Sequence, residues 1–147
     1  DTVRKYASIR DCALTASWNK PDNDAPERFT IDDAKHFLED SGLDEDDLED
    51  FTKRTNTIIS MLDADIPVTM SIGPGRYVNF NQGDYAFSAT AHYYIVGGMH
   101  LNYDNKTITL DIYSWGENYT VDYLEYTLAI YPDASDFSSY ILIKNKG

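Results

Sequence analysis

Apolar residues in the first half of the chain recur with the period of an α-helix. They occupy one face of residues 31–38, directly after Thr30, whose hydroxyl suits a helix N-cap. The same spacing over residues 51–62 predicts a further helix. A shorter half-apolar run predicts an earlier helix over residues 12–19, and the proline-containing residues 20–28 are expected to form a loop.

Beyond Pro67 the pattern changes to the alternation and the short apolar runs of β-strands. Residues 91–96 are the most apolar of these runs, which indicates a central strand. The polar segment Asp104-Asn105-Lys106 suits the turn of a hairpin. We expect a helical turn over residues 121–124 and strands at 68–72, 77–82, 91–96, 101–103, 107–113, 126–130 and 140–143.

The change of pattern near Pro67 divides the chain into a helical half, residues 1–66, and a β-rich half, residues 67–147. No linker separates the halves, so the sequence predicts one α+β domain that spans residues 1–147. A chain of 147 residues of which 42% are hydrophobic is long and apolar enough to bury a core.

Composition and charge narrow the classes of partner and cofactor. The formal net charge of -13 opposes binding to a phosphate backbone, so no nucleic-acid partner is expected. No apolar stretch approaches the roughly 18 residues of a membrane span. Eight of the twelve residues from Glu39 to Asp50 are acidic, but this run lacks the central glycine of a calcium loop, so we interpret it as a solvated helix face. No cofactor or metal is expected.

The single cysteine and the start of the chain bear on location. One cysteine excludes an internal disulfide and a multi-thiolate metal site. The chain begins at Asp1 without a methionine, which fits a processed or trimmed protein, and we expect an extracellular or cell-surface location. The sequence leaves the oligomeric state open.

Cys12 and one of three histidines are the candidate reactive pair. A thiol attacks as the thiolate, whose formation is favoured by a helix N-terminus and by a nearby imidazole, and Cys12 is expected at the start of the first helix. His92 opens the most apolar strand behind small residues, so we favour it as the base over His36, which lies mid-helix, and His100.

A base histidine also needs a third group that fixes its second nitrogen. The next strand offers Asp111, which lies beside His92 if the register of adjacent antiparallel strands allows it. Asn102 is a weaker candidate because it is closer to the hairpin turn. An ordinary polar residue on the solvent face of the strand is the alternative interpretation of Asp111.

The order of four short motifs resembles the papain-like cysteine peptidase fold, in particular the bacteriocin-leader-processing peptidases and their bacterial relatives. Those proteins have a cysteine that opens a helix, a strand entered through Pro-Val, a strand that begins with His-Tyr, and a strand that ends in Trp-Gly. The corresponding segments here are Asp11-Cys12-Ala13-Leu14-Thr15, Asp63-Ala64-Asp65-Ile66-Pro67-Val68, His92-Tyr93-Tyr94-Ile95-Val96-Gly97-Gly98 and Asp111-Ile112-Tyr113-Ser114-Trp115-Gly116.

The resemblance implies N-terminal helices packed on a C-terminal antiparallel sheet, with Cys12 as nucleophile and His92 as general base. Trp115 would shield the pair from water. Three departures concern the activity. Ala13-Leu14 replaces the usual Gly-Pro, Tyr113 stands where the family has its carboxylate, with Asp111 as the substitute, and Tyr6 stands where an oxyanion glutamine is expected.

Three functions follow from these observations. The first is a secreted bacterial thiol peptidase or amidase that cleaves a peptide or protein substrate with Cys12, His92 and Asp111. The second is a catalytically degenerate papain-like domain that binds a peptide or partner. The third is a β-rich adhesin or carbohydrate-binding module, suggested by the twelve tyrosines and two tryptophans.

Overall fold

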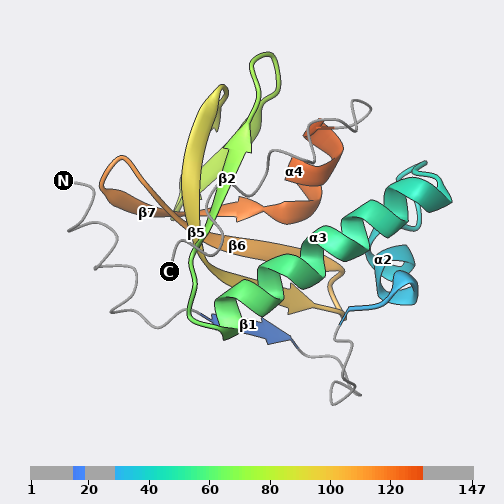
Figure 1. Ribbon diagram of the computed structural model, residues 1–147. Coiled ribbons are helices and arrows are strands. Elements are labelled where there is room, and N and C mark those ends of the chain that lie inside the picture. The colour runs from blue at the N-terminus through green and yellow to red at the C-terminus, as the bar shows by residue number, and fades with distance from the viewer. Residues whose placement is uncertain (1–14, 19–28, 131–147) are drawn as a thin grey trace.

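The computed structural model describes residues 15–18 and 29–130 of the chain. These residues form a seven-stranded sheet and three helices, shown in Figure 1. In chain order the elements are β1 Thr15–Trp18, α2 Ile31–Leu38, α3 Glu45–Asp63, β2 Val68–Ile72, β3 Val78–Gln82, β4 Tyr85–Ala89, β5 His92–Asn102, β6 Thr107–Ser114, β7 Glu117–Asp122 and α4 Tyr123–Ile130.

Strand β5 is the longest strand and organises the sheet. One of its edges pairs with β6, and β7, β3 and β4 follow outward from there. Its other edge is shared: β2 pairs antiparallel with the first half of β5, and β1 pairs parallel with the second half. Strands β2 to β7 are therefore joined by antiparallel pairings, and β1 is the one parallel addition among the described residues.

A β-bulge interrupts β5 between Val96 and Gly98. Before the bulge Tyr94 and Val96 are buried, and after it the buried residues are Met99 and Leu101. The extra residue at Gly97 shifts the alternation of inward and outward side chains by one position. The apolar side chains of β5 therefore lie on the inner face of the sheet both before and after the bulge.

The hairpin between β6 and β7 is closed by two residues, Trp115 and Gly116. Both have positive φ, 49° and 78°, and Ser114 pairs with Glu117 on either side of them. Positive φ at both central positions is the type I′ geometry whose twist matches the flanking strands. The turn fixes Trp115 at the end of the sheet, where its ring is 52% exposed.

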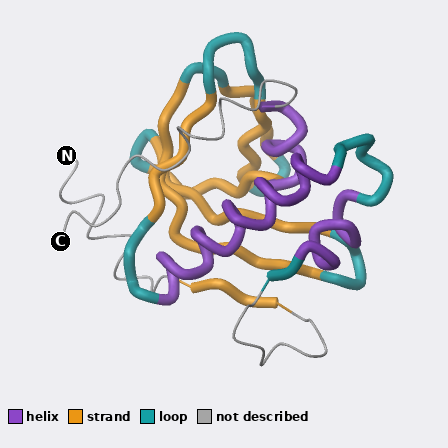
Figure 2. The backbone as a smooth tube through the Cα atoms, turned by 45° about the vertical axis from the view of Figure 1, so that its right-hand side comes forward, coloured by secondary structure: helices purple, strands orange, loops and turns teal. Residues whose placement is uncertain are grey.

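Helices α3 and α4 cover the apolar face of the sheet. Figures 1 and 2 show α3 crossing the strands, and it packs against β1, β2 and β5, while α4 packs against β3, β6 and β7. Within the acidic run, Asp44 caps α3 through a reciprocal capping box with Asp47. None of the described helices is long and apolar enough to cross a membrane.

A fully buried arginine joins α3 to α4. Arg54 Nε donates to the hydroxyl of Tyr123 at 2.8 Å, and Nη2 donates to Thr127. The guanidinium carbon also lies 4.8 and 5.4 Å from the ring centroids of Tyr123 and Tyr126. Hydrogen bonds and stacking on aromatic faces offset part of the cost of removing the guanidinium from water.

The mixed α+β class predicted from the sequence is confirmed, and so are the helices over 31–38 and 51–62 and most of the expected strands. The helix expected over residues 12–19 is wrong, because residues 15–18 form β1 instead. A short helical pattern is marginal without tertiary packing, and the open edge of β5 supplies backbone partners from Gly98 to Leu101.

The strand expected over residues 126–130 is also wrong, because these residues belong to α4. Tyr123, Tyr126, Thr127 and Ile130 are buried with helical spacing, so the packing of this face decides the structure over the strand preference of tyrosine, threonine and isoleucine. Strand β4 was not predicted, and the strand expected at residues 140–143 lies outside the described residues.

Replacement of Tyr123 by phenylalanine tests the buried arginine cluster. The Tyr123 hydroxyl accepts from Arg54 and lies 3.0 Å from the hydroxyl of Thr55. Its removal leaves buried donors without this partner, so we expect Tyr123→Phe to lower the free energy of unfolding by about 1–3 kcal/mol in urea titrations. Tyr85→Phe, at a tyrosine that is 61% exposed, is the control and should change it by less than about 0.5 kcal/mol. Equal stability of both variants would contradict the role of the cluster.

Candidate functional site

His92 begins β5 on the inner face of the sheet. Its Nε2 is hydrogen-bonded to the Ser114 hydroxyl at 2.5 Å. The indole of Trp115 stacks on the imidazole, with ring centroids 4.1 Å apart and planes inclined by 13°. A hydroxyl and an indole, both from the end of β6 and its turn, therefore fix the position of the ring.

The surroundings of His92 favour its neutral form. Burial lowers the pKa of His92 below its ordinary value of 6.5, because the charged imidazolium loses water there. A neutral imidazole can accept a proton, as a general base must. Ser114 is hydrogen-bonded to Nε2. Among the described residues no hydrogen bond to Nδ1 is found, so Nδ1 is the nitrogen that could take a proton from a nucleophile.

The expected pairing of His92 with Asp111 is wrong. Asp111 lies opposite Gly98 on β5 and Thr120 on β7, whereas His92 pairs with Ile72 on β2. Along β6 the inward side chains are Ile108, Leu110, Ile112 and Ser114, so Asp111 projects from the opposite face. The polar group that contacts His92 is Ser114, which was not predicted from the sequence. Its position directly before Trp115-Gly116, at the end of the strand, is the sequence feature that could have indicated it.

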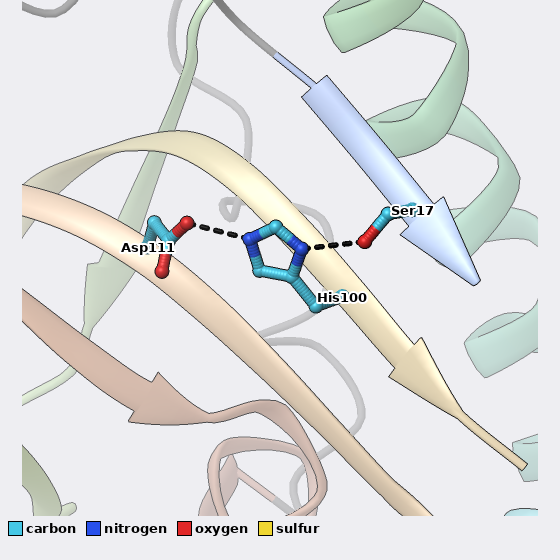
Figure 3. Close-up of polar contacts among 3 residues, drawn as sticks. All are labelled: Ser17, His100 and Asp111. Atoms are coloured by element: carbon cyan, nitrogen blue, oxygen red, sulfur yellow. Dashed lines mark hydrogen bonds and ion pairs between the residues drawn. The ribbon is translucent and has the colours of Figure 1, made fainter. Parts of the chain in front are cut away.

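Asp111 instead contacts His100 on the outer face of the sheet. Figure 3 shows a chain of hydrogen bonds from Ser17 Oγ to His100 Nδ1, 2.6 Å, and from His100 Nε2 to Asp111 Oδ2, also 2.6 Å. The three side chains come from three neighbouring strands, β1, β5 and β6. Ser17 was not predicted as a site residue, because residues 12–19 were expected to be helical.

Gly98 makes the room for the contact between His100 and Asp111. A Cβ atom at position 98 would lie 2.8 Å from Asp111 Oδ2 and 3.3 Å from His100 Nε2. The missing side chain thus leaves a notch into which the carboxylate and the imidazole converge.

A chain from hydroxyl through imidazole to carboxylate has the donor order that activates a nucleophile. Here, however, the side chains of His100 and Asp111 are 39% and 52% exposed, and Ser17 is also exposed. Acyl transfer further requires donors for the oxyanion and a site that excludes water. We therefore assign these contacts to the attachment of β1 to the sheet, where water competes with them and an exposed contact of this kind contributes about 0–1 kcal/mol.

The other predicted site residues have different positions. Cys12 and Tyr6 lie outside the described residues. Residues 15–18 are a strand, so the helix whose start was expected to activate Cys12 is not formed there. His36 packs against Tyr103, with Nε2 2.8 Å from its carbonyl oxygen, and Asn102 accepts from the backbone of Asn105.

The His92 environment predicts a pH dependence of stability. The folded pKa is lower than the unfolded pKa, so the unfolded chain takes up this proton first as the pH falls through about 6.5. We expect the wild-type protein to lose stability relative to His92→Gln between pH 7.5 and 5. Urea titrations of both proteins over this range measure the difference, and parallel profiles would contradict it.

The notch at Gly98 predicts a coupling with Asp111. Gly98→Ala forces the carboxylate away from the new methyl group, and we expect a loss of about 1–3 kcal/mol in the free energy of unfolding. In an Asp111→Ala background most of this loss should disappear, because the nearest atom is gone. Urea titrations of the four proteins of this cycle provide the test, and additive effects would show that the close approach is not the cause.

Comparison of this chain with protein-family models, curated proteins and solved structures finds no match.

Proposed function

We propose that the protein is an extracellular or cell-surface thiol peptidase or amidase with papain-like architecture. Cys12 is the nucleophile and His92 the general base. The observation that carries the proposal is the setting of His92: burial keeps its imidazole neutral, Ser114 engages Nε2, and Trp115 covers one face of the ring. The order of the motifs adds support. The strand that starts with His92 pairs with β2, which begins at the Pro67-Val68 motif, and with β6, which ends before the Trp115-Gly116 motif.

The mechanism assigns one task to each group. Nδ1 of His92 takes the proton of Cys12, and the thiolate attacks a peptide or amide carbonyl to form a tetrahedral intermediate. His92 then returns the proton to the leaving amine, and water hydrolyses the resulting thioester. In this mechanism Nε2 carries the proton and donates to the Ser114 hydroxyl, which leaves Nδ1 unprotonated. The Cys12 backbone N–H and the Tyr6 hydroxyl are the proposed oxyanion donors.

A peptide-binding domain without turnover is the second candidate. A specific observation favours it, namely that a neutral hydroxyl stands where a peptidase has a carboxylate or amide. A hydroxyl stabilises the imidazolium less than a carboxylate does, and loss of the carboxylate charge in a serine protease triad lowers kcat by about 10⁴. Exposed aromatic residues are compatible with peptide binding and also with the third function, a carbohydrate-binding module.

Alkylation of Cys12 tests the proposal. We expect iodoacetamide to label Cys12 at neutral pH at least about tenfold faster than a free cysteine, because proximity to a base increases the thiolate fraction. His92→Ala should remove this acceleration, and Ser114→Ala should reduce it. His36→Ala is the control, since His36 lies in a different part of the fold and contacts Tyr103.

The rate of alkylation, measured by intact-protein mass spectrometry, separates the candidates when it is combined with turnover. Fast labelling with peptide cleavage that is lost in Cys12→Ala supports the peptidase. Peptide binding with labelling no faster than that of a free thiol rejects the peptidase and favours the binding domain.

A further inference from the structure

We propose that the aromatic surface formed by Tyr85, Phe87 and Trp115 binds an extended cationic peptide, which adds as a strand to the outer edge of β4. The inference rests on the proposed function only in identifying this peptide as the substrate. Binding itself requires no catalytic step.

The aromatic surface is continuous from β4 to His92. The ring centroids of Tyr85 and Phe87 are 5.6 Å apart, and those of Phe87 and Trp115 are 5.5 Å apart. Trp115 in turn stacks on His92. Tyr85 is 61% exposed and Trp115 52% exposed, and the buried ring of Phe80 packs against Trp115 and Phe87. Adjacent exposed aromatic rings of this kind are typical of interaction sites.

The edge of β4 offers backbone groups to a peptide. Strand β4 ends the sheet and, among the described residues, pairs only with β3. Its sequence, Tyr-Ala-Phe-Ser-Ala, contains neither charge nor proline, and four of its five side chains are exposed or partly exposed. Proteins usually protect edge strands with charges or prolines, and an unprotected edge accepts an additional strand.

Charge decides which peptide fits. Asp84 lies in the exposed turn before β4, and Glu117 is exposed directly after the Trp115-Gly116 turn. The Gln82 amide donates to Glu117 at 2.9 Å, which holds this carboxylate beside the β3–β4 hairpin. Strands β3, β4, β6 and β7 contain no lysine or arginine. Lysine or arginine side chains of a peptide would therefore meet carboxylates and the face of an indole.

The same charges oppose a second copy of this chain as the occupant. Pairing of two β4 edges would bring together two molecules that each have a formal net charge of -13. Like charges at an interface disfavour association. A cationic partner removes this repulsion.

Strand addition also predicts the pattern of the peptide. Alternate side chains of an extended peptide point to the same side, so residues i and i+2 would face the aromatic surface together. A short acetylated and amidated peptide that alternates lysine and valine satisfies both requirements. Replacement of its lysines by glutamate tests charge, and N-methylation of alternate residues tests the backbone hydrogen bonds without altering charge.

Titration of the Cys12→Ala protein with these peptides, followed by intrinsic tryptophan fluorescence, provides the test. We expect saturable binding of the lysine peptide, weakened by added salt. The glutamate and N-methylated peptides should bind at least about tenfold more weakly, and so should the lysine peptide to Tyr85→Ser or to the Asp84→Asn/Glu117→Gln double variant. Tyr93→Ser is the matched control, because Tyr93 is 64% exposed and belongs to none of the ring pairs of the described residues.

Each alternative outcome has a defined meaning. Equal binding of the N-methylated peptide, or of the glutamate peptide, would overturn the inference, and so would dimerisation of the protein that competes with the peptide. Because Cys12→Ala lacks the nucleophile, peptide binding here stands even if the wild-type protein cleaves nothing. Cleavage by the wild-type protein with no preference for cationic peptides would instead retain the peptidase and reject this surface.

Discussion

The bulge at Val96 and Gly98 is the constraint that decides which polar side chains meet in this fold. His92 and His100 are an even number of residues apart, so a regular strand would place both on one face. The bulge sends His92 to the inner face, beside Ser114, and His100 to the outer face, beside Asp111. The two histidines thus acquire different partners and different degrees of burial through one extra residue.

The same strand also joins the two halves of the sheet. β5 pairs with β2 before the bulge and with β1 after it, while β6 pairs with the opposite edge of β5 from Ile95 to Asn102. Helices α3 and α4 then cover the inner face and are tied to each other by the buried Arg54 and its tyrosine and threonine partners. The end of the sheet beyond this covered core carries His92, Trp115 and the aromatic residues of β4.

Local pattern predicted a large part of this architecture because the segments involved are long and regular. The α3 helix extends over many turns with one apolar face, and the strands that begin at Val68, His92 and Thr107 are bounded by turn residues. Helical period is also present in α4, where Tyr123, Tyr126, Thr127 and Ile130 are buried, although tyrosine, threonine and isoleucine locally favour a strand. For residues 15–18 no local signal was sufficient, since their partner is an edge formed far along the chain.

By itself the sequence determined the α+β class, the position of His92 at the start of a central strand, and the Trp-Gly turn, because each of these follows from nearby residues. The partners of the histidines were decided by the tertiary structure. Pairing register and strand parity, which a bulge at a glycine can reverse, placed Ser114 rather than Asp111 at His92 and brought Ser17 to His100. Contacts of this kind join residues from different strands, so the periodicity of any one segment does not contain them.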